Sequence, residues 1–207
     1  MYWAEFFTVA LVHLLAVASP GPDFAVVIRE SVGSGRRQGL FCALGVALGI
    51  VVHVSYSLLG IGLIVAQSHT LFSILKLLAA GYLLYIGVKA LRAQPSGPAG
   101  AMQTLKSSTR SAFFKGLMTN GLNPKATLFF LSLFTLVISP NTPLPVQAAY
   151  GAYLVLATGV WFALVAMLFS KPCVRRGFER LGHWFDRLMG VVLIALALEL
   201  FFTQLSA

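Results

Sequence analysis

The sequence predicts an all-α, polytopic membrane protein whose six transmembrane helices form two inverted three-helix repeats. Hydrophobic residues make up 58% of the 207-residue chain and charged residues only 10%, which excludes an ordinary soluble domain. At about 20 apolar residues per crossing, six helices would use most of the apolar residues that the chain contains. Long charge-free runs and a proline motif in each half give the order of the helices and the internal repeat.

The three longest segments without Asp, Glu, Lys or Arg are 6–22, 38–75 and 126–170. The two longer runs are about twice as long as one crossing, so each predicts a pair of helices. Residues 68–70 can turn the chain within the first pair, and three prolines in 139–145 must interrupt the second. A membrane β-barrel is disfavoured because its strands alternate in polarity over roughly ten residues. The predicted helices are 4–28, 40–66, 71–91, 112–138, 147–169 and 186–203.

The positions of the basic residues predict the membrane topology. The net charge of +9 would also fit nucleic-acid binding, but all Lys and Arg residues except Lys76 and Lys125 gather at the connections after the first, third and fifth helices. The positive-inside rule then places these connections in the cytoplasm and both termini outside. A cleaved signal peptide is the competing interpretation of the first helix, but residues 1–5 carry an acid where a signal peptide has basic residues.

The whole chain, 1–207, is predicted to be one transmembrane domain made of two repeats. A linker rich in proline, glycine and serine at 93–111 separates repeat 1 (1–92) from repeat 2 (112–207). Because each repeat has three crossings, the second must run through the membrane upside down relative to the first. Inverted repeats of this kind are typical of secondary transporters, whose interrupted helices point to the binding site.

A proline motif interrupts the first helix of each repeat. Ser19-Pro20-Gly21-Pro22-Asp23 and Asn123-Pro124-Lys125 superimpose with an offset of about 103 residues. Pro20, Pro22 and Pro124 cannot donate backbone hydrogen bonds, so carbonyl groups lose their partners. Such backbone survives in a membrane only when it packs against protein or lines a water-filled cavity. The free carbonyls and helix ends can hold the ammonium and carboxylate of a zwitterion, although a proline kink satisfied by neighbouring helices is the simpler alternative.

Two charged residues lie beside these interruptions. Lys125 is ten residues beyond Lys115, on the order of 15 Å along a helix, and Asp23 also lies inside the cytoplasmic boundary. Ionisable residues at such depth usually line transport pathways. Structural pairing of Asp23 with Lys125 across the repeats is an open alternative that is compatible with transport.

The other polar residues of the helices predict less specific roles. We expect Lys76 and Glu199 to snorkel to the outer surface, and Glu30 to form a solvated pair beside Arg29. His13 and His53 are interpreted as hydrogen-bonded packing residues, because no Cys or carboxylate spacing supports a metal site. The sequence predicts no cofactor and no disulfide, since Cys42 and Cys173 fall on the cytoplasmic side. Gly45 and Gly49 form a GxxxG pattern, which is typical of close helix contact.

Three motifs in order resemble the LysE/RhtB family of bacterial amino-acid exporters. They are residues 19–23, the segment Gly81-Tyr82-Leu83-Leu84-Tyr85-Ile86-Gly87 with its continuation to Arg92, and Lys115-Gly116-Leu117 followed by Asn120 and Asn123-Pro124-Lys125-Ala126. The resemblance covers the whole chain and is strongest to the threonine-exporting branch. It implies efflux of threonine, homoserine or related neutral amino acids, an inner-membrane location and coupling to the proton gradient. It also implies a site at Pro20, Gly21, Pro22 and Asp23 with Asn120, Asn123, Pro124 and Lys125.

The working hypothesis is alternating access with proton antiport. Lys125 or exposed backbone amides would hold the carboxylate of a neutral amino acid, and Asp23 with the freed carbonyls would hold its ammonium. Asp23 would also couple transport to protons. A small-cation or metal-ion exporter of similar architecture is the alternative, disfavoured by the absence of clustered soft or acidic ligands. An intramembrane enzyme would need a nucleophile with a base or paired acids, and Asp23 alone supplies neither. Membrane lipid is an expected partner, and a homodimer remains open.

Overall fold

The computed structural model describes residues 2–19, 21–67, 69–92 and 107–171, together with Arg187, Leu188, Gly190, Val191, Ile194, Ala195, Ala197 and Leu198. Pro20, Glu199, Cys173, most of the predicted linker and much of the predicted sixth helix lie outside these described residues. Within them the chain is helical and contains no strand. The elements are α1 (Trp3–Ala18), α2 (Pro22–Gly33), α3 (Arg36–Gln67), α4 (His69–Leu91), α5 (Thr109–Gly121), α6 (Pro124–Ser132), the π-helical turn η1 (Leu133–Val137) and α7 (Leu144–Phe169).

Two helices in the described part are long and apolar enough to cross a membrane. They are the Arg36–Gly60 part of α3 and the whole of α7, with mean hydropathies of 2.0 and 2.2. A third crossing results if α1 and α2, whose axes meet at 55°, count as one bent span. These helices support a membrane-embedded protein, while the count of six spans and the inverted repeat stay predictions.

Local sequence sets the helix boundaries. Gly35 has a φ of 105°, a conformation that glycine adopts without steric cost, and it turns the chain between α2 and α3. Pro22 and Pro124 are the first residues of α2 and α6, where a missing N–H removes no helical hydrogen bond. The proline-containing connection after η1 ends at α7, and α3 ends at Gln67 just before α4 begins at His69, as the charge-free runs predicted.

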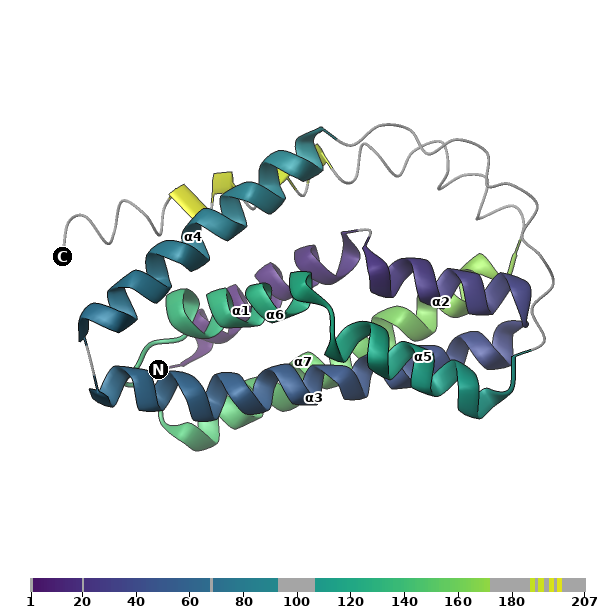
Figure 1. Cartoon of the computed structure of the whole chain (residues 1–207), viewed down its shortest axis with the longest axis horizontal. Coiled ribbons are helices and arrows are strands. Elements are labelled where there is room, and N and C mark those ends of the chain that lie inside the picture. The colour runs from purple at the N-terminus through teal and green to yellow at the C-terminus, as the bar shows by residue number, and fades with distance from the viewer. Residues whose placement is uncertain are drawn as a thin grey trace.

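The two helix interruptions fall midway along the bundle (Figure 1). In this view α1 and α6 lie toward one end of the molecule, α2 and α5 lie toward the other, and α3 and α7 run past both. Each end has its own hydrophobic cluster, the first around Phe130, Leu133 and Leu154 and the second around Val27, Val46 and Ala166. The ends of α1 and α5 and the starts of α2 and α6 therefore fall between two apolar clusters.

Glycine allows α3 and α5 to approach closely. A Cβ atom on Gly45 would collide with the backbone oxygen of Phe113, and one on Gly116 would collide with the backbone oxygen of Cys42. The close contact that the GxxxG pattern predicted is therefore present, and it is made with α5. Large apolar side chains elsewhere point outward, for example Leu59 on α3 and Leu156 on α7, which are 70% and 69% exposed and suit a lipid environment.

Candidate functional site

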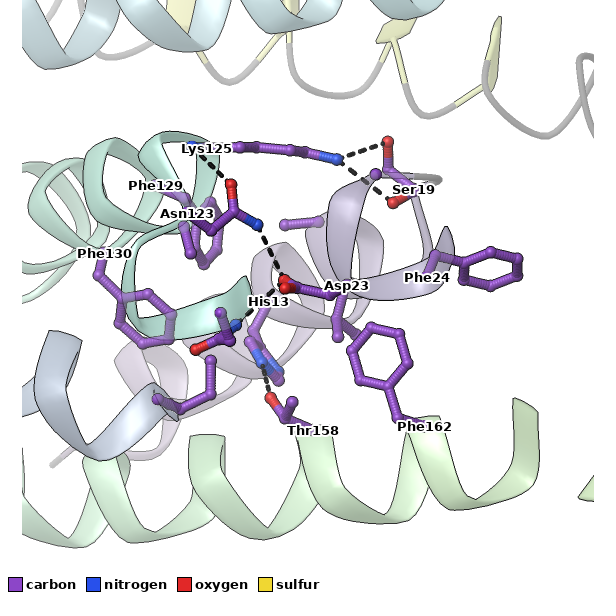
Figure 2. A pocket seen from close by; sticks show the side chains of 16 residues that line it. His13, Ser19, Asp23, Phe24, Asn123, Lys125, Phe129, Phe130, Thr158 and Phe162 are labelled. Atoms are coloured by element: carbon purple, nitrogen blue, oxygen red, sulfur yellow. Dashed lines mark hydrogen bonds between the residues drawn. The ribbon is translucent and has the colours of Figure 1, made fainter. Parts of the chain in front are cut away.

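One pocket lies between the two hydrophobic clusters, at the helix interruptions (Figure 2). It contains about 640 Å³ of empty space, counting the part that is open to solvent. The polar residues that line it come from both halves of the chain: His13, Ser19, Asp23, Asn120, Asn123, Lys125 and Thr158. The four residues predicted to bind substrate, Asp23, Asn120, Asn123 and Lys125, thus line the same cavity.

The Asp23 carboxylate is held asymmetrically. Asp23 is the second residue of α2, and its Oδ2 accepts hydrogen bonds from Asn120 Nδ2 and Asn123 Nδ2, each at 3.0 Å. Its other oxygen, Oδ1, is buried and has no hydrogen-bond partner among the described residues. A buried carboxylate oxygen without a partner is costly, so this atom is suited to bind a cation or a proton.

Lys125 makes the reverse connection across the two halves. It is the second residue of α6, and its Nζ donates to the Ser19 carbonyl oxygen at 3.2 Å and to Ser19 Oγ at 3.1 Å. Ser19 is the C-cap residue of α1. Asp23, in the first half of the chain, is therefore bound by the two asparagines at the second interruption. Lys125, in the second half, is bound by Ser19 at the first interruption.

The amide side chains at the second interruption have fixed orientations. Asn123 caps α6 by accepting a hydrogen bond from the Lys125 backbone N–H at 2.9 Å, which leaves its Nδ2 to donate to Asp23. The backbone carbonyl oxygen of Asn120 accepts from His53 Nε2 at 2.9 Å, and the His53 ring stacks on Phe130. Both asparagines are almost fully buried, at 1% and 3% exposed, so neither can rotate away into solvent.

The His53 ring links α3 to both sides of this interruption. The Tyr56 hydroxyl lies 3.0 Å from His53 Nδ1 and donates to the Thr127 carbonyl at 3.1 Å. His53 is thus a hydrogen-bonded packing residue, as predicted, and its contacts position Asn120. Sequence alone did not show that this histidine reaches the interruption 67 residues further along the chain.

The electrostatic field at the pocket stabilises the Asp23 carboxylate and would also stabilise a bound anion. Helices α2 and α6 both begin at the pocket, with Gly21 and Asn123 as their N-cap residues. Helix N-termini carry partial positive charge, which stabilises negative groups nearby. Together with the Lys125 amine, they can compensate the carboxylate of a zwitterion in addition to that of Asp23.

Three contacts at or near the pocket were not predicted from the sequence. Ser19 was not identified as the partner of Lys125, and His13 was not assigned to the pocket. The His13 ring lies 3.0 Å from Thr158 Oγ1, a partner 145 residues away that no local pattern indicates. The third contact joins Glu30 to Lys115 at 2.7 Å.

The Glu30–Lys115 pair corrects the expectation of a solvated pair beside Arg29. Glu30 is 1% exposed because its face of α2 packs in the second cluster, whereas the Lys115 side chain on α5 remains 44% exposed. Lys115 therefore brings its charge to a carboxylate that solvent cannot reach. The pair connects the first half of the chain to the second on the side where the basic residues gather.

A second tie joins the halves at the opposite end of the bundle. Glu5 of α1 accepts hydrogen bonds from the Ser139 backbone N–H at 2.9 Å and from Thr142 Oγ1 at 3.0 Å. The Tyr150 hydroxyl of α7 donates to the Tyr2 carbonyl at 3.0 Å. The pocket thus lies between two sets of polar contacts that connect the first half of the chain to the second.

Comparison with known proteins adds independent information. A family model described as LysE type translocator matches residues 14–204. The threonine efflux protein of Salmonella typhi is 36% identical over 203 residues, which cover 96% of this chain and 98% of that protein. The threonine efflux protein of Escherichia coli strain K12 is 34% identical over 204 residues, with coverage of 96% and 98%. An uncharacterized membrane protein of Escherichia coli strain K12, YahN, is 32% identical over 200 residues, with coverage of 96% and 89%. No solved structure is significantly similar.

Proposed function

The chain belongs to the LysE type translocator family, and from this membership we propose that it exports neutral amino acids of the threonine and homoserine kind from the cytoplasm. The family makes it a membrane transporter rather than an enzyme. The proposed location is the bacterial inner membrane, with both termini on the periplasmic side, because the basic residues gather at three connections.

The observation that carries the proposal is the asymmetric binding of Asp23. One carboxylate oxygen accepts two amide hydrogen bonds from the opposite half, and the other is buried without a partner in the described part of the chain. An ammonium group is a suitable ligand for this second oxygen, because a charge-assisted hydrogen bond offsets its burial. Lys125 lines the same pocket and is positioned to bind the carboxylate of the same zwitterion.

Proton coupling follows from the same carboxylate. Oδ1 of Asp23 can bind the ammonium of the substrate or a proton, but it cannot hold both at once. Export of the amino acid and import of a proton would therefore use one site in alternation, which is the requirement for antiport. The two amide donors keep the carboxylate in place in either condition.

Alternating access would require the ties at the two ends of the bundle to open in turn. On the cytoplasmic side the Glu30–Lys115 pair connects α2 to α5, and at the other end Glu5 binds the connection before α7. Each tie joins one half of the chain to the other. Rocking of the halves would break one set of contacts while the other persists, so that the pocket opens to one side of the membrane at a time.

Export from loaded cells tests the proposal. A bacterial strain that lacks its own exporters would be loaded with radiolabelled threonine, homoserine, lysine or leucine, with and without expression of the protein. We expect faster release of threonine and homoserine on expression, and loss of this release when a protonophore removes the gradient. Equal release by expressing and control cells for every amino acid would contradict the proposal.

Growth in toxic compounds separates amino-acid export from the metal-ion alternative. Expression should protect cells against toxic concentrations of threonine or homoserine and leave their sensitivity to toxic divalent metals unchanged. Protection against metals alone would favour the cation exporter instead.

A further inference from the structure

We infer that His13, oriented by Thr158, is a specificity-determining residue that donates a hydrogen bond to a hydroxyl group on the side chain of the transported amino acid. The inference rests on the proposed amino-acid export and adds the recognition of the side chain to that of the ammonium and carboxylate.

His13 combines complete burial with an unsatisfied polar atom. Its side chain is 2% exposed and lines the same pocket as Asp23 and Lys125. Its Nε2 lies 3.0 Å from Thr158 Oγ1, and its Nδ1 is buried with no hydrogen-bond partner in the described part of the chain. A buried nitrogen without a partner is costly to the protein on its own, so a ligand that satisfies it gains affinity.

The hydroxyl of Thr158 determines which ring nitrogen carries the hydrogen. Thr127 and Thr135 donate to the carbonyl four residues earlier in their helices, but Thr158 makes no such bond among the described residues. Because its hydroxyl has no such carbonyl acceptor, we assign it as the donor to His13 Nε2, which lies 3.0 Å away. In a neutral imidazole the hydrogen is then on Nδ1, so the atom without a partner is a donor.

A donor at this place requires an acceptor on the ligand. Figure 2 shows the His13 ring between Thr158 and the Asp23 carboxylate, on the side of the pocket away from Lys125. An amino acid bound through its ammonium to Asp23 and its carboxylate to Lys125 would direct its side chain toward α1 and α7. Phe129 and Phe162 form apolar walls there, and neither can hydrogen-bond to a hydroxyl on the substrate side chain.

The three groups together select for size and polarity. The apolar walls accept aliphatic carbon, while His13 Nδ1 is left unpaired by a side chain without an acceptor. A site built to hydrogen-bond a hydroxyl discriminates strongly against the isostere that lacks it. We therefore expect threonine to be exported in preference to valine, and homoserine in preference to norvaline, by roughly tenfold or more.

The test compares export of these isosteric pairs by proteoliposomes that contain the purified full-length chain. In the wild-type protein the ratio of the threonine export rate to the valine export rate should be about ten or higher. His13→Phe keeps an aromatic ring against Phe129 and Tyr153 but has no donor, and it should bring the ratio close to one. An unchanged ratio in His13→Phe would overturn the inference and reduce His13 to a packing residue.

A matched pair of variants keeps the inference testable if His13→Phe fails to fold. The amide nitrogen of asparagine can take the place of Nδ1, and that of glutamine can take the place of Nε2. His13→Asn should therefore retain most of the threonine preference, and His13→Gln should lose it. The opposite order, or equal ratios in the two variants, would contradict the inference. For a variant without transport, the ratio is measured by displacing bound radiolabelled threonine with unlabelled threonine or valine.

The wild-type result separates failure of the inference from failure of the proposed function. If the wild-type protein exports threonine and valine at equal rates, only the role of His13 is overturned. If it exports no amino acid while cells expressing it remain sensitive to toxic threonine, the proposed function itself fails.

Discussion

Asn123 Nδ2 donates to Asp23 Oδ2 at 3.0 Å, while Asn123 Oδ1 accepts from the Lys125 backbone N–H at 2.9 Å. The Asn123 side chain therefore caps α6 and also binds Asp23, which belongs to the other half of the chain. This double use makes Asn123 sensitive to a substitution that preserves only one of its two contacts.

Asn123→Asp should retain the helix cap and lose export. Aspartate is as good an N-cap as asparagine, but it cannot donate to Asp23 and instead places a second carboxylate beside it. Loss of a hydrogen bond to a charged group predicts a decrease in threonine export of roughly tenfold to a hundredfold. Asn141→Asp, on an exposed connection, is the control and should export at the wild-type rate. Equal export by the two variants would contradict the role of Asn123.

Gly49→Ala should disturb the site from a distance. A Cβ atom on Gly49 would lie 2.5 Å from Asn120 Oδ1 and 2.7 Å from Asn120 Cβ, so the asparagine would have to move. Overpacking of this kind costs about 1–3 kcal/mol and should lower both the melting temperature and threonine export. Gly60→Ala in the same helix is the control, because no atom of the described residues lies within 4 Å of its added Cβ. If the two variants melt and export alike, Asn120 does not depend on the space at Gly49.

Removing Lys115 should destabilise the protein more than removing the charge of its partner Glu30. Lys115→Met leaves the carboxylate of Glu30, which is 1% exposed, without its cation, and this should destabilise the protein by roughly 3 kcal/mol. Glu30→Gln leaves only Lys115, whose side chain is 44% exposed and remains solvated, so its effect should be smaller. The double variant Glu30→Gln/Lys115→Met should recover most of the loss. Thermal unfolding of the detergent-purified proteins measures all three, and equal effects of the single variants would contradict this asymmetry.

Lys125→Met should abolish recognition of the substrate carboxylate. The wild-type protein should bind threonine more tightly than threoninol, the amino alcohol that has no carboxylate, by roughly tenfold or more. In Lys125→Met this discrimination should fall close to one, because the apolar side chain keeps the length but removes the charge. Lys171→Met, at an exposed position after α7, provides the control for loss of a basic residue. A preserved preference for threonine in Lys125→Met would assign the carboxylate to another group.

Features that depend on local sequence could be predicted, and those that depend on tertiary contact could not. The runs without charge indicated the break between α3 and α4 and the break between η1 and α7, because an apolar run longer than one crossing must turn. The pocket-lining positions of Asp23 and Lys125 were also expected, because ionisable groups beside interrupted helices need a polar environment.

The partners of the site residues were outside the reach of sequence patterns. Lys125 binds Ser19, which is 106 residues away, and Glu30 was assigned to Arg29 because the charge of Lys115, 85 residues away, had no local signal. Which face of a nearly uniform apolar helix packs inward is decided by its neighbours. The sequence around His13 therefore gives no sign that Thr158 of α7 contacts it.

Gradient-driven transport by the Asp23→Asn variant shows whether this carboxylate couples amino-acid export to protons. The variant keeps the shape of the side chain and removes its charge, so purified protein in proteoliposomes should no longer bind the ammonium group or exchange it for a proton. We predict that an imposed pH gradient drives threonine transport by the wild-type protein and that Asp23→Asn shows none of this gradient-dependent transport. Gradient-dependent threonine transport at the wild-type rate in Asp23→Asn would contradict the account.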